Sequence, residues 1–160
     1  MDFKESEINH YFEILKNTNF QKVYKSVIDY LRNLKSYLEK KYSDYVVSSL
    51  YLGYLDMTYF SFTPKDLKDK GLKVAIVLLH QEERIELWLS GINKKVQSEY
   101  IDKLKEKDLK GLKLSIALPG VDSIIEKKIV EKINLIDIES LNKQIEKETM
   151  SFINIIKVLI

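Results

Sequence analysis

The stretch 72-LKVAIVLLHQEERIELWLSG-91 decides the fold, because two strand-like runs flank a short polar turn, 80-HQEE-83. Alternating apolar and polar residues on both sides of a turn predict a β-hairpin. With a two-residue loop, Ala75 lies opposite Trp88. Neither residue of the Gln-Glu loop favours the positive φ of a primed turn, so a longer loop remains an alternative. The stretch therefore predicts two antiparallel strands.

This pairing gives the hairpin two different faces, since paired residues project to the same side of a sheet. One face is wholly apolar and carries Val74, Ile76, Leu78, Ile85, Leu87 and Leu89. The other face is mixed and carries Lys73, Ala75, Val77, Leu79, Arg84, Glu86, Trp88 and Ser90. Shifting the register by one residue would mix the two sets, so the pattern supports this pairing.

The remaining segments predict an α+β domain, with one domain over residues 1–160. Apolar residues at helical spacing predict helices over 5–17, 20–41, 93–107 (with Asn93 as N-cap) and from Asp137 or Ser140 to the end of the chain. Residues rich in β-branched and aromatic types predict one or two strands in 46–63 and a further strand in 112–118. Residues 123–131 predict another strand, with a helix as the alternative. We expect a mainly antiparallel sheet of about four to five strands packed with helices, in the order α-α-β-β-β-α-β-β-α.

The composition limits the classes of partner. Twenty-six basic and 24 acidic residues give a net charge of +2, and Arg occurs only at Arg32 and Arg84. Without a large positive excess or many arginines, we expect neither nucleic-acid nor membrane binding. There is no Cys, which excludes disulfides and thiolate ligands. We expect a cytoplasmic protein without cofactor or metal.

Candidate ligand-binding residues lie in two places. Arg84, Glu86 and Trp88 alternate along one strand, and Tyr54 and Asp56 belong to the aromatic stretch 51-YLGYLDMTYFSFTP-64. If the two strands are neighbours, Asp56 can pair with Arg84 beneath Trp88 and tyrosines, and a charged pair among aromatics can hold a small polar ligand. The alternatives are a structural ion pair or a subunit interface. Most aromatics of the stretch are expected in the core, which leaves Asp56 in need of a partner.

The acid-x-Lys triplet Glu126-Lys127-Lys128, with Asp122 just before it, suggests a metal-dependent nuclease as a further hypothesis. Asp122, Glu126 and Lys128 have the residue types with which restriction-enzyme-like nucleases hold Mg²⁺ and steady the attacking hydroxide. Several such triplets are expected by chance in a chain with this many acids and lysines. This hypothesis requires the three side chains to converge with another acid.

Four blocks of the chain carry a resemblance: 45-YVVSSLYLGYLDMTYFSFTP-64, 72-LKVAIVLLH-80, 84-RIELWLSGINKKVQ-97 and 120-GVDSIIE-126. With the segments DMTYFSFTP, WLSG-x-N and GVDSIIE, the chain resembles a family of small uncharacterised bacterial proteins, a domain of unknown function. The resemblance implies a stand-alone domain of bacterial, cytosolic origin and supplies no catalytic residues.

The sequence thus favours a non-enzymatic cytosolic binding or protein-interaction module, with a homodimer expected from the surplus of aromatics on sheet faces. The alternative is a small-ligand-binding protein or an enzyme with a site around Asp56 and Arg84. The partner is accordingly a second copy, a protein or a small polar ligand, and whether the protein is an enzyme stays open.

Overall fold

The predicted hairpin forms as expected in the computed structural model, which describes residues 1–160. Strand β3 (Leu72–Leu79) pairs with β4 (Arg84–Gly91), and Ala75 lies opposite Trp88. The loop is the longer alternative, His80–Glu83. Glu83 N–H donates to the His80 carbonyl at 3.3 Å, and Glu83 alone in this loop has a positive φ, 54°. The positive φ thus falls on Glu83 and outside the pair Gln81–Glu82. The register of β3 against β4 is the predicted one.

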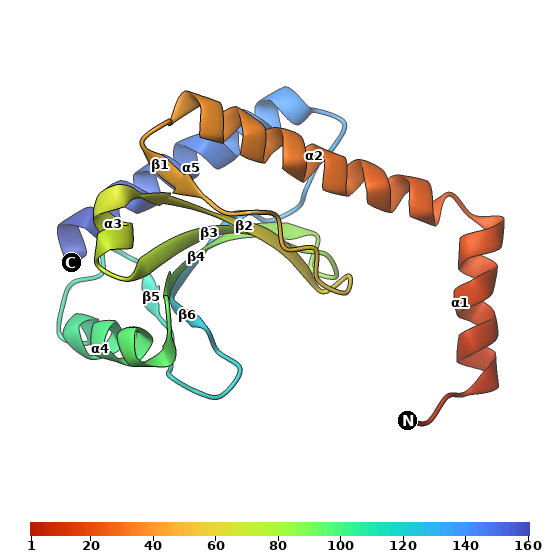
Figure 1. Cartoon of the computed structure of the whole chain (residues 1–160), viewed down its shortest axis with the longest axis horizontal. Helices are drawn as coiled ribbons and strands as arrows, with labels where there is room; N and C mark the ends of the chain where they lie inside the picture. Colours follow the sequence, from red (N-terminus) through yellow and green to blue (C-terminus); the bar gives the residue numbers. More distant parts are fainter. The chain divides into compact units, whose positions relative to one another are not determined.

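The hairpin is the centre of a six-stranded antiparallel sheet with the order β1-β2-β3-β4-β6-β5 (Figure 1). The other strands are β1 (Tyr45–Val47), β2 (Met57–Pro64), β5 (Lys113–Leu114) and β6 (Ser123–Val130). The α+β class is confirmed, whereas the expectation of about four to five strands is too low. The expected element order lacks one strand and a short helix over 65–69. The segment 46–63 contributes two strands separated by a long loop, and only two residues of the predicted strand 112–118 pair with β6.

One face of the sheet lies in the core. All six residues of the predicted apolar face are at most 4% exposed. From β2 the same face receives Thr58, Phe60 and Phe62, because Thr58 pairs with Leu78 and Phe60 with Ile76. The opposite face of β2 carries Met57, Tyr59 and Ser61, all partly exposed. The aromatics of this stretch that are expected in the core therefore divide, since Phe60 and Phe62 are buried and Tyr59 is partly exposed.

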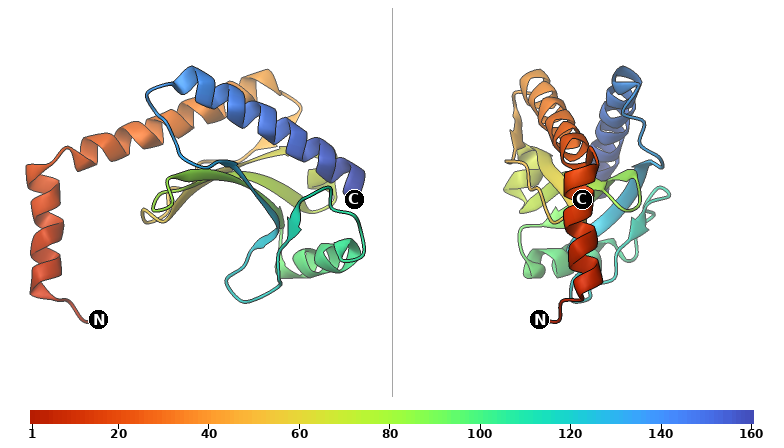
Figure 2. Two further views of the ribbon diagram at one scale, coloured as in Figure 1. Left: turned by 180° about the vertical axis from the view of Figure 1, so that it is seen from behind. Right: turned by 90° about the vertical axis from the view of Figure 1, so that its right-hand side faces the viewer.

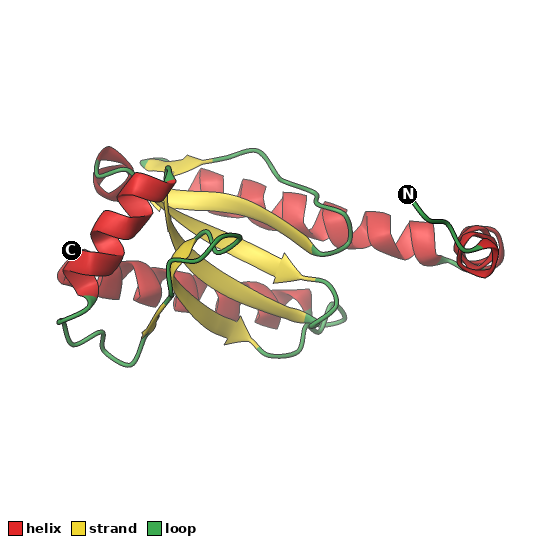
Figure 3. Cartoon of the chain, turned by 90° about the horizontal axis from the view of Figure 1, so that it is seen from below, coloured by secondary structure: helices red, strands yellow, loops and turns green.

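The chain divides into two compact units, Met1–Ser36 and Tyr37–Ile160. The second unit holds the sheet, together with helices α3 (Lys65–Asp69), α4 (Lys94–Leu104) and α5 (Ile138–Leu159). Helices α4 and α5 lie on opposite sides of the sheet (Figure 2), and Figure 3 shows the strands from below. Asn93 caps α4 as predicted, since its Oδ1 accepts from Val96 N–H at 2.9 Å. Asp137 caps α5 through Ser140 N–H.

Glu146 of α5 ties that helix to the end of α2 (Phe20–Lys41) within the second unit. Its carboxylate accepts from the hydroxyls of Tyr37 at 2.7 Å and Tyr42 at 2.6 Å, and pairs with Lys41 at 2.6 Å. Burial alone would raise the pKa of Glu146, but the hydrogen bonds from Lys41, Tyr42 and Tyr37 outweigh it and hold the pKa below its usual range. Three donors on one carboxylate fix the helix position.

The first unit contains α1 (Glu5–Asn17) and most of α2, both with the predicted bounds. No residue of α1 is buried, although its apolar residues recur at the helical spacing that predicts this helix. The expectation of one domain over 1–160 stays a prediction.

Candidate functional site

The mixed face of the sheet forms the floor of a pocket of about 660 Å³ in the second unit. Strands β2, β3 and β4 supply the floor, and the segment 48–51, the start of α4 and residues 120–126 supply the rim. The pocket is lined by Ser48, Ser49, Tyr51, Met57, Tyr59, Ser61, Lys73, Ala75, Val77, Trp88, Ser90, Gly91, Ile92, Asn93, Lys94, Gln97, Gly120, Val121, Asp122 and Glu126. Its volume lies within the range of small-molecule sites.

The hollow exists because small side chains occupy the middle of the floor. Ser61 of β2 lies opposite Ala75 of β3, and Ala75 lies opposite Trp88 of β4. Tyr59 is two positions from Ser61 on the same face, since successive side chains of a strand alternate between faces. The small residues Ser61 and Ala75 therefore lie between Tyr59 and Trp88, which is the single tryptophan of the chain.

Two stacked tyrosines form one wall. The rings of Tyr51 and Tyr59 have centroids 4.9 Å apart and planes inclined by 32°. Their backbones exchange two hydrogen bonds of 2.8 and 3.0 Å, which fasten the loop between β1 and β2 to strand β2. Burial raises the pKa of the Tyr59 phenol. The wall is thus an aromatic surface that backbone hydrogen bonds hold in place.

A glycine makes the turn behind this wall. Gly53 has φ 68°, and a Cβ added there would lie 2.0 Å from the Met57 carbonyl oxygen. A side chain at this position is excluded by both conformation and space. Gly53 therefore lets the chain turn back into β2 and bring Tyr51 over Tyr59.

Trp88 is held by the strand on which it lies. Its Nε1–H donates to Glu86 Oε2 at 2.7 Å, and Arg84 Nε donates to Glu86 Oε1, also at 2.7 Å. The Glu86 side chain is only 4% exposed, and both of its oxygens are engaged. A buried carboxylate needs such partners, and in return it fixes the orientation of the indole. Of the five predicted ligand-binding residues, Trp88 lines the pocket, and Glu86 and Arg84 support it.

Tyr54 and Asp56 lie elsewhere. Asp56 precedes β2, in the turn, and its Oδ1 accepts from Tyr54 N–H at 2.8 Å. This bond, with a second from Met57 N–H, lowers the pKa of the carboxyl. The expected pair with Arg84 does not form, because Asp56 has a backbone partner and Arg84 has Glu86. Tyr54 is 92% exposed, and neither residue lines the pocket.

His80 fastens the same turn from the other side. The Thr58 hydroxyl donates to the Leu52 carbonyl at 2.7 Å and lies 2.8 Å from His80 Nε2. A hydroxyl has only one proton to donate, so Nε2 of His80 carries the hydrogen of the second bond. Burial lowers the pKa of His80, partly opposed by the charge of Asp56. His80 therefore acts here as a neutral, structural group.

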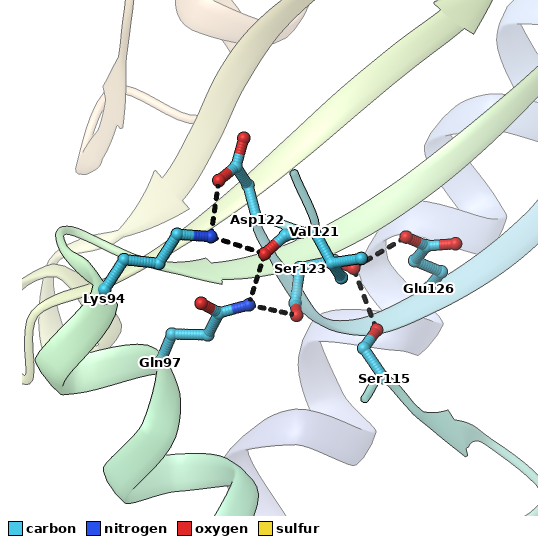
Figure 4. Close-up of polar contacts among 7 residues, drawn as sticks. All are labelled: Lys94, Gln97, Ser115, Val121, Asp122, Ser123 and Glu126. Atoms are coloured by element: carbon cyan, nitrogen blue, oxygen red, sulfur yellow. Dashed lines mark hydrogen bonds and ion pairs between the residues drawn. The ribbon is translucent and has the colours of Figure 1, made fainter. Parts of the chain in front are cut away.

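The opposite rim is built where α4 meets the segment before β6 (Figure 4). The Gln97 amide is buried, and its Nε2 donates to the carbonyls of Val121 at 2.8 Å and Ser123 at 3.0 Å. Lys94 donates to the Val121 carbonyl at 2.6 Å and pairs with Asp122 at 2.9 Å. These bonds hold the rim in place.

Strand β4 reaches this rim through Gly91. A Cβ added at Gly91 would lie 2.7 Å from Gln97 N. The close approach of the strand end to helix α4 therefore requires a residue without a side chain.

A chain of hydroxyls runs from β5 to Glu126 (Figure 4). Ser115 Oγ lies 2.8 Å from Ser123 Oγ, which donates to Glu126 Oε1 at 2.6 Å. The convergence that the nuclease hypothesis requires is not found, since Asp122 pairs with Lys94 and no group of three acidic or histidine side chains could hold a metal ion.

Sequence reasoning missed the tyrosine wall and the α4 rim. The hairpin register already places Lys73, Ala75, Val77, Trp88 and Ser90 on one face, and the alternation of β2 adds Tyr59 and Ser61. No local signal indicates that Tyr51 folds back onto Tyr59 or that Gln97 reaches two carbonyls, because both contacts depend on tertiary structure.

The chain matches, over residues 4–160, the family described as a domain of unknown function, DUF7000, and belongs to it. The expected membership of a family without assigned function is thus confirmed, while the bacterial origin and the recurrence of the quoted segments stay predictions. No curated protein and no solved structure matches the chain. None of its helices combines the length and apolar character needed to cross a bilayer.

Proposed function

We propose that the protein is a non-enzymatic binding module that holds a small, flat molecule on the open face of its sheet. The observation that carries this proposal is the pocket of about 660 Å³, in which the Tyr51–Tyr59 pair and Trp88 flank a floor of small residues. Aromatic side chains bind flat rings by offset or edge-to-face stacking. Between them lie the small side chains of Ser61 and Ala75, which line the same pocket.

The hydrogen bonds of Glu86 and Gln97 support binding over catalysis. Glu86 is committed to Arg84 and Trp88, and Gln97 is committed to two carbonyls. These groups hold walls in place, as expected of a preorganised site whose affinity comes from shape. The sequence alternative is a small-ligand site around Asp56 and Arg84. The pocket proposed here keeps only Trp88 of the five predicted residues as a lining residue.

The single tryptophan makes a direct test available. Excitation at the red edge of protein absorption reports only Trp88, and indole-free flat molecules such as guanosine and adenosine serve as uncharged probes. We expect saturable quenching of Trp88 emission by at least one of them. Absence of quenching by any flat probe would contradict the proposal.

A matched pair of variants separates pocket binding from surface binding. The chain has two alanines, Ala75 on the pocket floor and Ala117 in an exposed loop. Ala75→Leu fills the floor and is expected to weaken binding by about tenfold or more, equivalent to about 1.4 kcal/mol. Ala117→Leu adds the same atoms elsewhere and is expected to leave the affinity unchanged. Equal effects of the two would contradict the assignment of the site.

The homodimer and the cytoplasmic location stay predictions. The exposed apolar side chains Ile116 and Leu118, 72% and 55% exposed, offer a surface that a second copy could cover. Extension of the sheet is a poor route, because the edge strands β1 and β5 have only three and two residues. Light scattering over micromolar concentrations tests the dimer, and a strict monomer would contradict it.

A further inference from the structure

The charges of the pocket point to the chemical class of the ligand, given the proposed binding function on which this inference rests. Four ionisable side chains other than tyrosine line the pocket: Lys73, Lys94, Asp122 and Glu126. Lys94 and Asp122 neutralise one another at 2.9 Å. Lys73 takes part in none of the ion pairs or side-chain hydrogen bonds of the chain. Glu126 has one contact, Ser123 Oγ on Oε1 at 2.6 Å, which leaves Oε2 without a partner.

The two unpaired charges lie at opposite sides of Trp88. Lys73 is opposite Ser90 on β4, and Trp88 is opposite Glu126 on β6. Two strand spacings and two residues along the strand separate the Cα atoms of Lys73 and Glu126 by about 12 Å. No ion pair joins them. A ligand can therefore meet a cation at one end, the indole in the middle and a carboxylate oxygen at the other end.

We infer that the pocket takes a flat heterocycle that carries an anionic group, the chemistry of a purine nucleoside monophosphate. The anionic group meets the Lys73 ammonium, with the Ser90 hydroxyl beside it. The ring stacks on the aromatic side chains, and its N–H edge donates to Glu126. A carboxylate is acceptor-only, so it selects a ring edge with donors. The free Oε2 and the remaining lone pair of Oε1 suit two neighbouring donors of one edge. Lys73 thus faces the anionic group, the aromatic side chains face the ring, and Glu126 faces the N–H edge of the ring.

Lys73 is tested with guanosine 5′-monophosphate, which has both the anion and the donor edge, against guanosine, which lacks the anion. Quenching of Trp88 emission is expected to show about fivefold tighter binding of the monophosphate at low salt, a factor typical of one solvent-accessible ion pair. Lys73→Gln is expected to abolish this difference and to leave guanosine binding unchanged. Lys95→Gln removes an exposed charge outside the pocket and is expected to change neither affinity.

Glu126 is tested by comparing the guanine monophosphate with adenosine 5′-monophosphate, whose ring edge lacks the paired donors. Wild type is expected to prefer the guanine compound, and Glu126→Gln to reduce that preference by about fivefold, since an amide offers only one acceptor oxygen. Circular dichroism spectra of the two exposed-site variants, Lys73→Gln and Glu126→Gln, confirm that both remain folded.

Two results would overturn the inference while leaving the proposed function in place. The first is equal binding of guanosine and its monophosphate by the wild type. The second is a loss in Lys73→Gln that is the same for both compounds, because a structural effect on the pocket would not discriminate between them. Failure of every probe to quench Trp88 would overturn the inference and the proposed function together.

Discussion

Replacing Glu86 by Ala tests whether this buried carboxylate is the support of the pocket floor. The change removes the common acceptor of two hydrogen bonds of 2.7 Å, from Trp88 Nε1 and Arg84 Nε. Hydrogen bonds to charged groups contribute about 1.5–3 kcal/mol each. The Arg84 side chain is 28% exposed, so water recovers part of its solvation, and that contribution is smaller than the indole's. We expect the free energy of unfolding to fall by about 2–3 kcal/mol.

Urea unfolding followed by far-ultraviolet circular dichroism measures this loss without relying on the tryptophan. Glu86→Gln keeps one oxygen as acceptor and is expected to cost about 1–2 kcal/mol. Glu82→Ala, at an exposed turn position, is the control, with an expected change within about 0.5 kcal/mol. A loss below about 0.5 kcal/mol for Glu86→Ala would show that the Glu86 carboxylate does not support the pocket floor. A double-mutant cycle with Trp88→Phe should give a coupling of about 1 kcal/mol.

Three further changes test other parts of the account. Thr149→Val should raise the free energy of unfolding by about 1 kcal/mol, because Thr149 Oγ1 is buried in α5 without a hydrogen-bond partner. An unchanged midpoint of urea unfolding would contradict this expectation. Because the pKa of Glu146 is lowered in the folded state, its ionised carboxylate stabilises the fold above the unfolded pKa of about 4.5. This stability is lost as the pH falls through the folded pKa. In thermal unfolding, Glu146→Gln should therefore reduce the loss of stability at acid pH. His80 likewise has a lowered pKa, so its protonation opposes folding, and the free energy of unfolding should fall below about pH 6.5. If His80→Gln left the dependence of this free energy on pH unchanged between about pH 7 and pH 5, His80 would not be the cause of the fall.

The fold could be predicted where apolar residues recur with the period of a helix or a strand. The hairpin register, the helix bounds at 5–17 and 20–41 and the Asn93 cap follow from alternation, helical spacing and capping chemistry. The loop between β1 and β2 could not be predicted in this way. Its residues are as aromatic as a strand, and the turn depends on Gly53 and on long-range hydrogen bonds to β2.

The site was predicted in part for the same reason. Arg84, Glu86 and Trp88 share a face because side chains of a strand alternate, and that much is local. The assignment of Asp56 failed because a short acidic side chain in a turn finds backbone N–H donors nearby, which satisfies it without a cation. The tyrosines that line the pocket together with Trp88 are Tyr51 and Tyr59, whereas Tyr54 lies outside it.

The most direct test of the central claim is a ¹⁵N-edited spectrum of the labelled chain during titration with guanosine 5′-monophosphate. Trp88 supplies the single indole N–H resonance, and its hydrogen bond to Glu86 should make this resonance distinct. We expect saturable shifts of that resonance together with the backbone amide resonances of Ser61, Ala75 and Ser90. Shifts confined to α5 or to the first unit, with the indole resonance unmoved, would contradict it.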